Sequence, residues 1–434
     1  MITVAEINDI DRLDNIRLAW HSLLGKTKGV TFAHSPEWLE HYWDHFGEGL
    51  KLRVLLVTLG NKIIGIVPLV VKPVPTKMGT MRVLTNPLDG WGIFHGQIGS
   101  NPAATMVTAM RYLQSSKRDW DLIDFRYIDQ EGHDHKRTSN AFKAVGFQGS
   151  QATWKQHPII NTQNTNWTSY LESRSKQTQL RIEMAEQIVS KTGQDIFYRS
   201  KLEDPSAPGW SPRWDLWSEF EQMNFTFGSQ TTLAGGQYSK SRKLAFLKEI
   251  HAPAVRQGMA RIDALFINHS LAVCAYGLQH AEGTDYLALG RRNDIPQEAV
   301  TALIARMIQQ SIQDGEHALN LALLSPQLAN EWKNQNKSSY RCSHFPITVP
   351  RSQVFRMNRW MQTPISKKTA SKVTTTHNPE LNSVQTQNQH SNIEIFAEAP
   401  QSWPDEKHPR SNGNPGSNHG KNPSGDRPKF RIVG

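Results

Sequence analysis

Cysteine is scarce in this chain, which has only Cys274 and Cys342 among 434 residues. Two cysteines at this spacing exclude both a disulfide framework and a zinc-binding C-x-x-C pattern. Cys274 stands in the apolar run 271–276, so we predict a small core residue rather than a nucleophile. The sequence also has no Gly-x-Ser-x-Gly motif, and we expect no covalent nucleophile.

Long apolar runs are missing as well. The most apolar window, 54–71, is interrupted by Gly60-Asn61-Lys62, and β-branched residues crowd its second half. This pattern predicts a strand, a tight turn and a second strand rather than a membrane span. The first residues have neither the basic nor the apolar segment of a signal peptide, so we expect a cytoplasmic protein without a transmembrane segment.

Acidic residues are outnumbered, with 39 Asp and Glu against 49 Lys and Arg and a formal net charge of +10. Such a surplus favours acidic partners, although it could equally be spread over solvated faces and a tail. The sequence has no helix-turn-helix, RNP motif or zinc finger, so we do not expect nucleic acid as a partner.

The apolar spacing predicts an α+β fold in which one succession of elements occurs twice. The segments 51–127 and 259–324 each show two strands, a turn, a third strand, a helix and a fourth strand. Because 434 residues exceed what one core accommodates, we predict two units, 1–158 and 159–350, each with a mixed central sheet. A long helix over 167–192 opens the second unit, with Gly193 as its stop.

The composition changes after about residue 363, where Ser, Thr, Asn, Gln, His, Pro and Gly dominate. A segment of this kind cannot bury enough apolar surface to offset the entropy lost on ordering. We therefore predict that 364–434 is a disordered, basic and polar tail.

An ordered series of segments resembles the CelD-like, FemAB-related acetyltransferases of the acyl-CoA N-acyltransferase (GNAT) superfamily. The segments that carry the resemblance are Thr31–Leu39, Arg53–Val57, Ile63–Leu69, Lys117–Arg126, Trp167–Val189 and Met259–Leu324. Lys117–Arg126 looks like the family's strand before the second half, and Trp167–Val189 occupies the place of its basic helix. Met259–Leu324 looks like the acyl-CoA-binding half. The similarity covers about residues 1 to 345.

The resemblance implies two tandem GNAT folds, of which the second holds acetyl-CoA or another acyl-CoA as co-substrate, without a metal. The strand Thr284–Leu289, including Leu287 and Leu289, would pair with the pantetheine arm. The following loop and helix start, including Gln297 and Ala299, would bind the pyrophosphate through backbone N–H groups and the helix dipole.

Two arginines in this loop, Arg291 and Arg292, would add charge-assisted contacts to the phosphates, or would belong to a solvated turn. The family's Ser-Pro-Gly is replaced here by Ile-Pro-Gln, which ends at Gln297 and is followed by Glu298. Glutamine hinders the close approach that glycine permits, and the glutamate adds a negative charge near the phosphates.

Amide formation from a thioester needs a base for the amine proton and can use an acid for the leaving thiolate. Tyr286 could be that acid, or a half-buried aromatic residue of the strand. His280 or Glu282 could be the base, or part of a surface hairpin turn. We interpret the histidines of Gly132-His-Asp-His as a solvent-facing loop rather than a zinc site.

Three tryptophans lie close together in the sequence. Trp210, Trp214 and Trp217 share a helical face, which predicts core packing or, if the face is open, a groove for a glycan.

Two hypotheses for the function follow from the sequence. The first hypothesis is an acyl-CoA-dependent N- or O-acyltransferase acting on an amino sugar, polysaccharide precursor or related amine. The second, motivated by Gln297 and Glu298, is a non-catalytic descendant that binds an anionic polymer or a protein partner.

Overall fold

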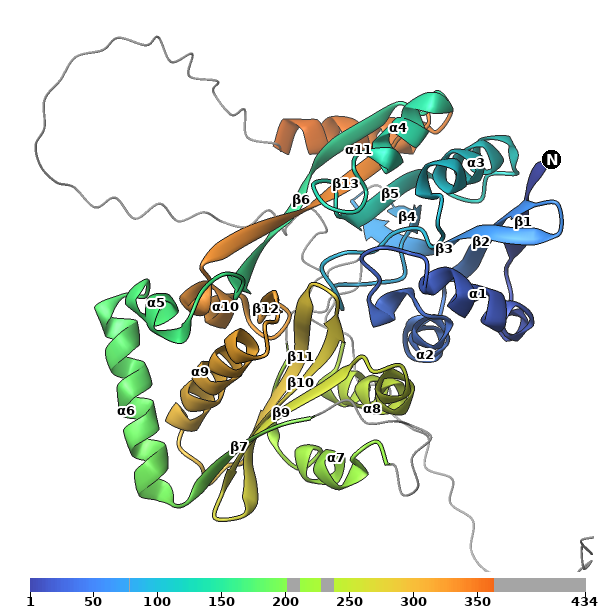
Figure 1. Ribbon diagram of the computed structural model, residues 1–434. Coiled ribbons are helices and arrows are strands. Elements are labelled where there is room, and N and C mark those ends of the chain that lie inside the picture. Colours follow the sequence, from blue (N-terminus) through green and yellow to red (C-terminus); the bar gives the residue numbers. More distant parts are fainter. Residues whose placement is uncertain (78, 201–210, 228–237, 363–434) are drawn as a thin grey trace, which may run out of the picture. The chain divides into compact units, whose positions relative to one another are not determined.

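The computed structural model in Figure 1 describes residues 1–77, 79–200, 211–227 and 238–362. These residues belong to one compact unit of contacts. The predicted disordered tail, 364–434, and Trp210 lie outside the described residues. No described helix has the length and apolar character needed to cross a lipid bilayer.

One mixed sheet runs through the described part of the chain. Its strands are β1 (Ile2–Ile7), β2 (Lys51–Leu59), β3 (Lys62–Thr76), β4 (Gly79–Thr85), β5 (Leu122–Ile128), β6 (Gly149–Asn161), β7 (Asp195–Arg199), β8 (Asn224–Phe227), β9 (Ala260–Ile267), β10 (Ser270–His280), β11 (Gly283–Arg291), β12 (Ala318–Asn320) and β13 (Gln335–His344). Their order is β1-β2-β3-β4-β5-β13-β6-β12-β11-β10-β9-β7, and β8 pairs with β11 outside this path. The pairs β4–β5 and β11–β12 are parallel, and the other pairs are antiparallel.

Helices connect the strands and pack on the sheet. They are α1 (Arg17–Leu24), α2 (Pro36–Phe46), α3 (Pro102–Ser115), α4 (Arg137–Ala144), α5 (Trp167–Glu172), α6 (Lys176–Thr192), α7 (Trp214–Phe220), α8 (Lys240–Arg256), α9 (Glu298–Gln313), α10 (Pro326–Trp332) and α11 (Pro350–Gln362), with short 3-10 turns η1 (Ile10–Ile16) and η2 (Phe32–His34). Helix α2 begins with a capped turn, in which Ser35 accepts the N–H of Trp38 at 3.1 Å and Pro36 occupies the first turn.

The single helix predicted over 167–192 is wrong, because the structure has α5 and α6 with a break between them. Ser175 begins α6 by accepting the N–H of Thr178 with its side chain. A serine that caps a new helix competes with continuation of the previous one, since its side chain satisfies an N–H that would otherwise bond within the helix.

The predicted succession of strands and helix occurs twice, as β2-β3-β4-α3-β5 and as β9-β10-β11-α9-β12. The predicted boundary at residue 158 falls inside β6. Strand β13, which follows the second copy, lies between β5 and β6 (Figure 1). The sheet therefore interlocks the two copies, and the division into two units stays a prediction.

Aromatic side chains of α2, of α8 and of the segment after β4 meet in one core. The ring of Phe246, on α8, lies with its centroid 5.0 Å from Trp38 and from Phe46 on α2, and 4.8 Å from Trp91. Of the described tryptophans in the predicted cluster, Trp217 is buried, as expected of core packing, whereas Trp214 is 37% exposed. Burial of such large side chains is the main source of stability in this region.

Candidate functional site

The predicted donor strand, Thr284–Leu289, lies within β11. One edge of β11 is paired with β10 along its whole length. On the other edge, β12 pairs with Thr284 and Asp285 only, and β8 pairs with Ala288–Arg291. The two parallel strands β11 and β12 therefore separate after Asp285. Farther along the same edge of β11, β8 takes the place of β12 from Ala288 onward.

This arrangement divides the edge that the resemblance assigns to pantetheine. Leu289 faces Thr226 of β8 in the ladder, whereas no ladder partner faces Leu287 on that edge among the described residues. Both leucine side chains are buried in the core. An extended ligand can therefore pair with β11 only across the short gap between Asp285 and Ala288 while β8 stays in place.

The arginines of the following loop are already engaged. Arg291 donates from Nη1 to the backbone oxygens of Arg292, at 3.3 Å, and of Ile295. Arg292 donates to Asp294 Oδ1 at 2.6 Å and to Leu271 O at 3.3 Å. These two side chains brace the loop in this structure, so their predicted contacts with phosphate stay a prediction.

The N-terminus of α9 offers few groups to an anion. Gln297 occupies the cap position without a side-chain capping bond, and Glu298 lies in the first turn. The N–H of the fully buried Ala299 donates to Pro296 O at 3.2 Å, and the N–H of Val300 donates to Gln297 O at 3.1 Å. Two of the amides that a pyrophosphate would need are thus satisfied within the chain.

Tyr286 is a buried core residue rather than the half-exposed aromatic residue considered from the sequence. Its hydroxyl donates to Asp263 Oδ2, and Arg199 binds the same carboxylate with Nε at 2.7 Å. Burial, followed by the charge of Asp263, raises the pKa of Tyr286 well above its ordinary value. Because this hydroxyl is held away from solvent, the geometry does not support Tyr286 as the acid for a leaving thiolate.

His280 and Tyr286 are not brought together. Tyr286 packs with the core beneath α6 and α9, while the adjacent Asp285 projects to the opposite face, since successive side chains of a strand alternate. Asp285 is the residue that meets His280, with Nε2 and Oδ2 3.8 Å apart. The side chains of both are mostly buried, with exposed fractions of 7% and 13%.

The hydrogen bonds of this pair assign a role to each partner. Asn320 Nδ2 donates to Asp285 Oδ1 at 2.8 Å and thereby leaves Oδ2 toward the histidine. The N–H of Glu282 donates to His280 Nδ1 at 3.3 Å. A ring nitrogen that accepts a hydrogen bond carries no proton, so the neutral imidazole carries its proton on Nε2. The predicted role of His280 as the base stays a prediction, and Asp285 is the carboxylate that lies beside it.

Further polar residues surround this pair at the meeting point of the two copies. Lys337 Nζ donates to Glu282 Oε2 at 2.6 Å, and His133 pairs with the other oxygen of that carboxylate. His157 Nε2 lies 2.8 Å from Ser339 Oγ. We call this group the junction cluster; its members are His133, His157, His280, Glu282, Asp285, Asn320, Lys337 and Ser339.

The interpretation of Gly132-His-Asp-His as a solvent-facing loop is wrong in part. Asp134 is buried and accepts the N–H and hydroxyl of Thr138 in α4, and His133 is paired with Glu282. Ligand atoms of Asp129, His133 and Glu282 lie within 4.8 Å of one another, as a metal would require. However, Lys337 and two backbone N–H groups already neutralise and bond these carboxylates.

Sequence reasoning missed most of the junction cluster. Asp285 had a usable signal, because a carboxylate in the apolar run of β11 needs a partner to be buried. His157 and Lys337 had none, because they belong to polar strands whose partners are distant in the chain.

No protein-family model matches the chain, and no curated protein matches it. Among solved structures, FemX is 11% identical, covering 78% of this chain and 98% of its own, with a TM-score of 0.49. L-PGS from Bacillus licheniformis is 11% identical, covering 77% and 94%, with a TM-score of 0.43. A tandem GNAT protein from the clavulanic acid biosynthesis pathway is 10% identical, covering 80% and 99%, with a TM-score of 0.38. Likenesses of this size do not assign an activity to this chain.

Proposed function

We propose that the chain is an acyltransferase that uses an acyl-CoA, such as acetyl-CoA, and modifies an amine or hydroxyl acceptor at the junction cluster. The observation that carries the proposal is the Asp285–His280 pair, held by Asn320 at the point where β11 and β12 part. The ordered series of segments that resembles the CelD-like acetyltransferases supports the same reaction class. That resemblance is also the reason for proposing an amino sugar or polysaccharide precursor as the acceptor.

In the proposed reaction, the pantetheine arm enters the gap on β11 between Asp285 and Ala288. The acceptor nitrogen or oxygen attacks the thioester carbonyl carbon, and Asp285 Oδ2 removes its proton. His280 donates its Nε2–H to the oxygen that becomes negative in the tetrahedral intermediate. The carbon–sulfur bond then breaks, and the thiolate leaves with the coenzyme.

The test is an assay of thiol release by the full chain with acetyl-CoA and longer acyl-CoAs and a panel of amine and hydroxyl acceptors. Asp285→Asn should lower turnover roughly 10²–10⁴-fold, as loss of a general base does, with donor binding retained. Asp11→Asn, at an exposed residue of η1, is the matched control and should leave turnover unchanged. Equal turnover of both variants would contradict the assignment of Asp285.

The second candidate function is that of a non-catalytic binding protein. It is favoured by β8, which occupies half of the donor edge, and by Arg291 and Arg292, which are engaged within their own loop. Thermal unfolding of the full chain distinguishes the two. A ligand at about a hundred times its dissociation constant adds roughly 2.7 kcal/mol of stability, so a donor site shifts the midpoint upward. No shift with any acyl-CoA would favour the non-catalytic function.

A further inference from the structure

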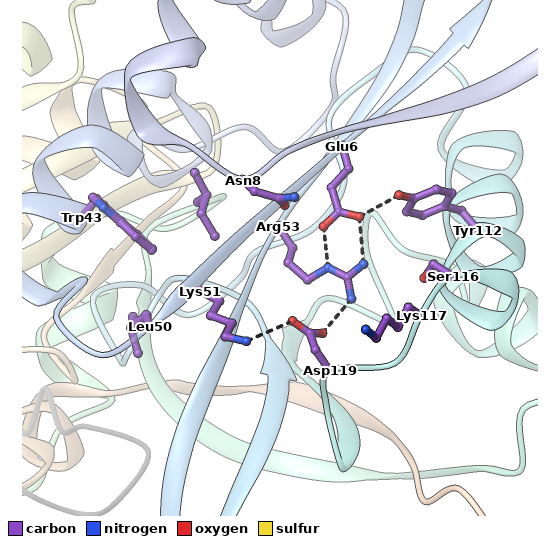
Figure 2. A pocket seen from close by; sticks show the side chains of 11 residues that line it. Glu6, Asn8, Trp43, Leu50, Lys51, Arg53, Tyr112, Ser116, Lys117 and Asp119 are labelled. Atoms are coloured by element: carbon purple, nitrogen blue, oxygen red, sulfur yellow. Dashed lines mark hydrogen bonds and ion pairs between the residues drawn. The ribbon is translucent and has the colours of Figure 1, made fainter.

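A hollow of about 680 Å³ lies between α2, the β1–β2 pair and the end of α3, and it shares no residue with the junction cluster (Figure 2). It has a charged floor, an apolar wall and a basic rim. None of these three features takes part in the proposed acyl transfer.

The floor is a hydrogen-bonded pair of buried charges. Arg53 donates to Glu6 from Nε at 2.6 Å and from Nη2 at 2.8 Å, and the hydroxyl of Tyr112 donates to the same carboxylate at 2.8 Å. Arg53 Nη1 donates to Asp119 Oδ1 at 3.1 Å. Because these bonds fix every member in place, the hollow has a rigid polar base (Figure 2).

The rim of the hollow carries a net positive charge. Lys51, Arg53 and Lys117 stand against Glu6 and Asp119, which is three cations against two anions. The guanidinium of Arg53 is hydrogen-bonded to both carboxylates, so the excess positive charge of the hollow lies on the two lysines. Lys51 is 64% exposed with Nζ 3.8 Å from Asp119 Oδ2, and Lys117 has no ion pair with any described residue. Two ammonium groups at one opening favour an anionic ligand.

The wall is formed by Trp43 and Leu50, which are both partly buried. A Cβ added at Gly47 would lie 2.8 Å from Trp43 Cδ2, so the end of α2 packs directly behind the indole ring. The ring is thereby held as a fixed apolar surface beside polar groups. A flat aromatic surface next to planar hydrogen-bonding side chains suits the C–H face and the hydroxyl groups of a sugar ring.

We propose that this hollow binds an acidic saccharide, meaning a sugar unit that carries a carboxylate or a phosphate. The sugar ring lies against Trp43 and Leu50, its hydroxyl groups bond to Asp119 and to the hydroxyl of Ser116, and its acidic group lies between Lys51 and Lys117. Asp119 Oδ2 and the Lys51 ammonium form only a long ion pair of 3.8 Å, with side chains 32% and 64% exposed, so a ligand that lies between them can replace it; Lys117 lines the same hollow.

The test is calorimetric titration of the full chain with glucuronate, a glucose phosphate ester, neutral glucose, inorganic phosphate and a short oligogalacturonate. We expect the acidic sugars to bind, and glucose and inorganic phosphate to bind at least about tenfold more weakly, since each engages only part of the site. The variant with both Lys51→Gln and Lys117→Gln should weaken binding of the acidic sugars about tenfold or more. Lys62→Gln, at the exposed β2–β3 turn, is the matched control and should bind like the unmodified chain.

Trp43→Leu provides a second variant, which should weaken binding of every sugar and leave any binding of inorganic phosphate unchanged. Binding of the oligogalacturonate alone would support a polysaccharide as the source of the sugar unit, and binding of the single sugars would support a free sugar. The proposal is overturned if no acidic sugar binds, if both lysine substitutions leave binding unchanged, or if inorganic phosphate binds as tightly as the glucose phosphate ester.

Discussion

The carboxylate of Asp89 is a buried charge that three other side chains contact. Lys72 Nζ lies 2.5 Å from Asp89 Oδ2, and the same oxygen accepts the hydroxyls of Tyr42 and Tyr238. Both charged side chains are 5% exposed. Burial lowers the pKa of Lys72 from its ordinary value, and Asp89 opposes that shift. Through Tyr42 and Tyr238, the pair connects β3 with α2 and with the segment just before α8.

We therefore expect Asp89→Asn to destabilise the fold strongly. Asp89 has a φ of 45°, which asparagine also tolerates, so the change removes charge without adding backbone strain. It leaves the Lys72 ammonium buried without a counter-charge, which should cost about 3 kcal/mol in the free energy of unfolding, measured by urea denaturation. Asp294→Asn, in an exposed ion pair with Arg292, should change stability far less, because solvent screens such a pair. Equal effects of the two substitutions would contradict this view of Lys72.

At the scale of elements, two strands decide what the sheet can do. Strand β13 pairs with β5 on one side and with β6 on the other, so a segment from beyond the second copy completes the sheet of the first. Strand β8 pairs with the end of β11 and covers the edge that the resemblance assigns to the acyl donor. The first strand makes the fold one continuous sheet, and the second pairs with β11 beyond the point where β11 and β12 part.

The role of β8 can be tested with a proline on that strand. Thr226→Pro removes a backbone N–H and distorts the pairing of β8 with β11, whereas Thr226→Ala keeps the backbone intact. If β8 competes with the donor for the edge, the proline variant should show a larger rise of the unfolding midpoint with acetyl-CoA than the alanine variant. Identical shifts of the two variants would show that β8 does not obstruct the donor.

At the scale of the whole molecule, buried neutral histidines make the fold sensitive to acid. Burial lowers the pKa of His34 and of His157 to about 4, and it lowers the pKa of His95 well below its ordinary value. For His34 the nearby His280 and His133 add to the shift, and for His157 the nearby Lys155 does. These residues lie where the two copies meet, so protonating them opposes the contact between the copies.

The sign of the pH dependence follows from linkage. The unfolded chain takes up protons at these histidines below about pH 6.5, while the folded chain takes them up only near pH 4, so stability is lost as the pH falls through that window. At about pH 5, His34 and His157 should each subtract about 2 kcal/mol from the free energy of unfolding. Urea denaturation at about pH 7.5 and about pH 5 measures this loss of stability. The variant His157→Gln should lose about 2 kcal/mol less than the unmodified chain between these two pH values, because it lacks one of the two histidines. A pH-independent midpoint would contradict the prediction.

The sequence predicted the parts whose signal is local. The hairpin of β2 and β3 and the strand–helix succession of both copies follow from apolar spacing and turn residues within a few positions. Strands β1, β6, β8 and β13 were not predicted. Strand β13 (Gln335–His344) is largely polar, and it becomes a strand because β5 and β6 satisfy its backbone on both sides.

The candidate site shows the same division. The segment Thr284–Leu289 could be identified as a strand from its residues, but whether Tyr286 faces solvent or Asp263 depends on the packing of α6 and α9. Similarly, Arg291 and Arg292 could be placed in a loop, but not their bonds to that loop's own backbone and to Asp294. A residue's chemistry is local, whereas its burial and partners are set by elements that lie far away along the chain.

By itself, the sequence determined the α+β composition and the repeated order of elements, because these depend on residue type and short-range spacing. Only the tertiary structure decided that β13 completes the sheet of the first copy, that β8 pairs with the end of β11, and that Asp285 rather than Tyr286 meets His280. The physical reason is that strand pairing joins segments that are distant along the chain, and the packing of these segments sets the direction and the partners of each side chain, which no local pattern encodes.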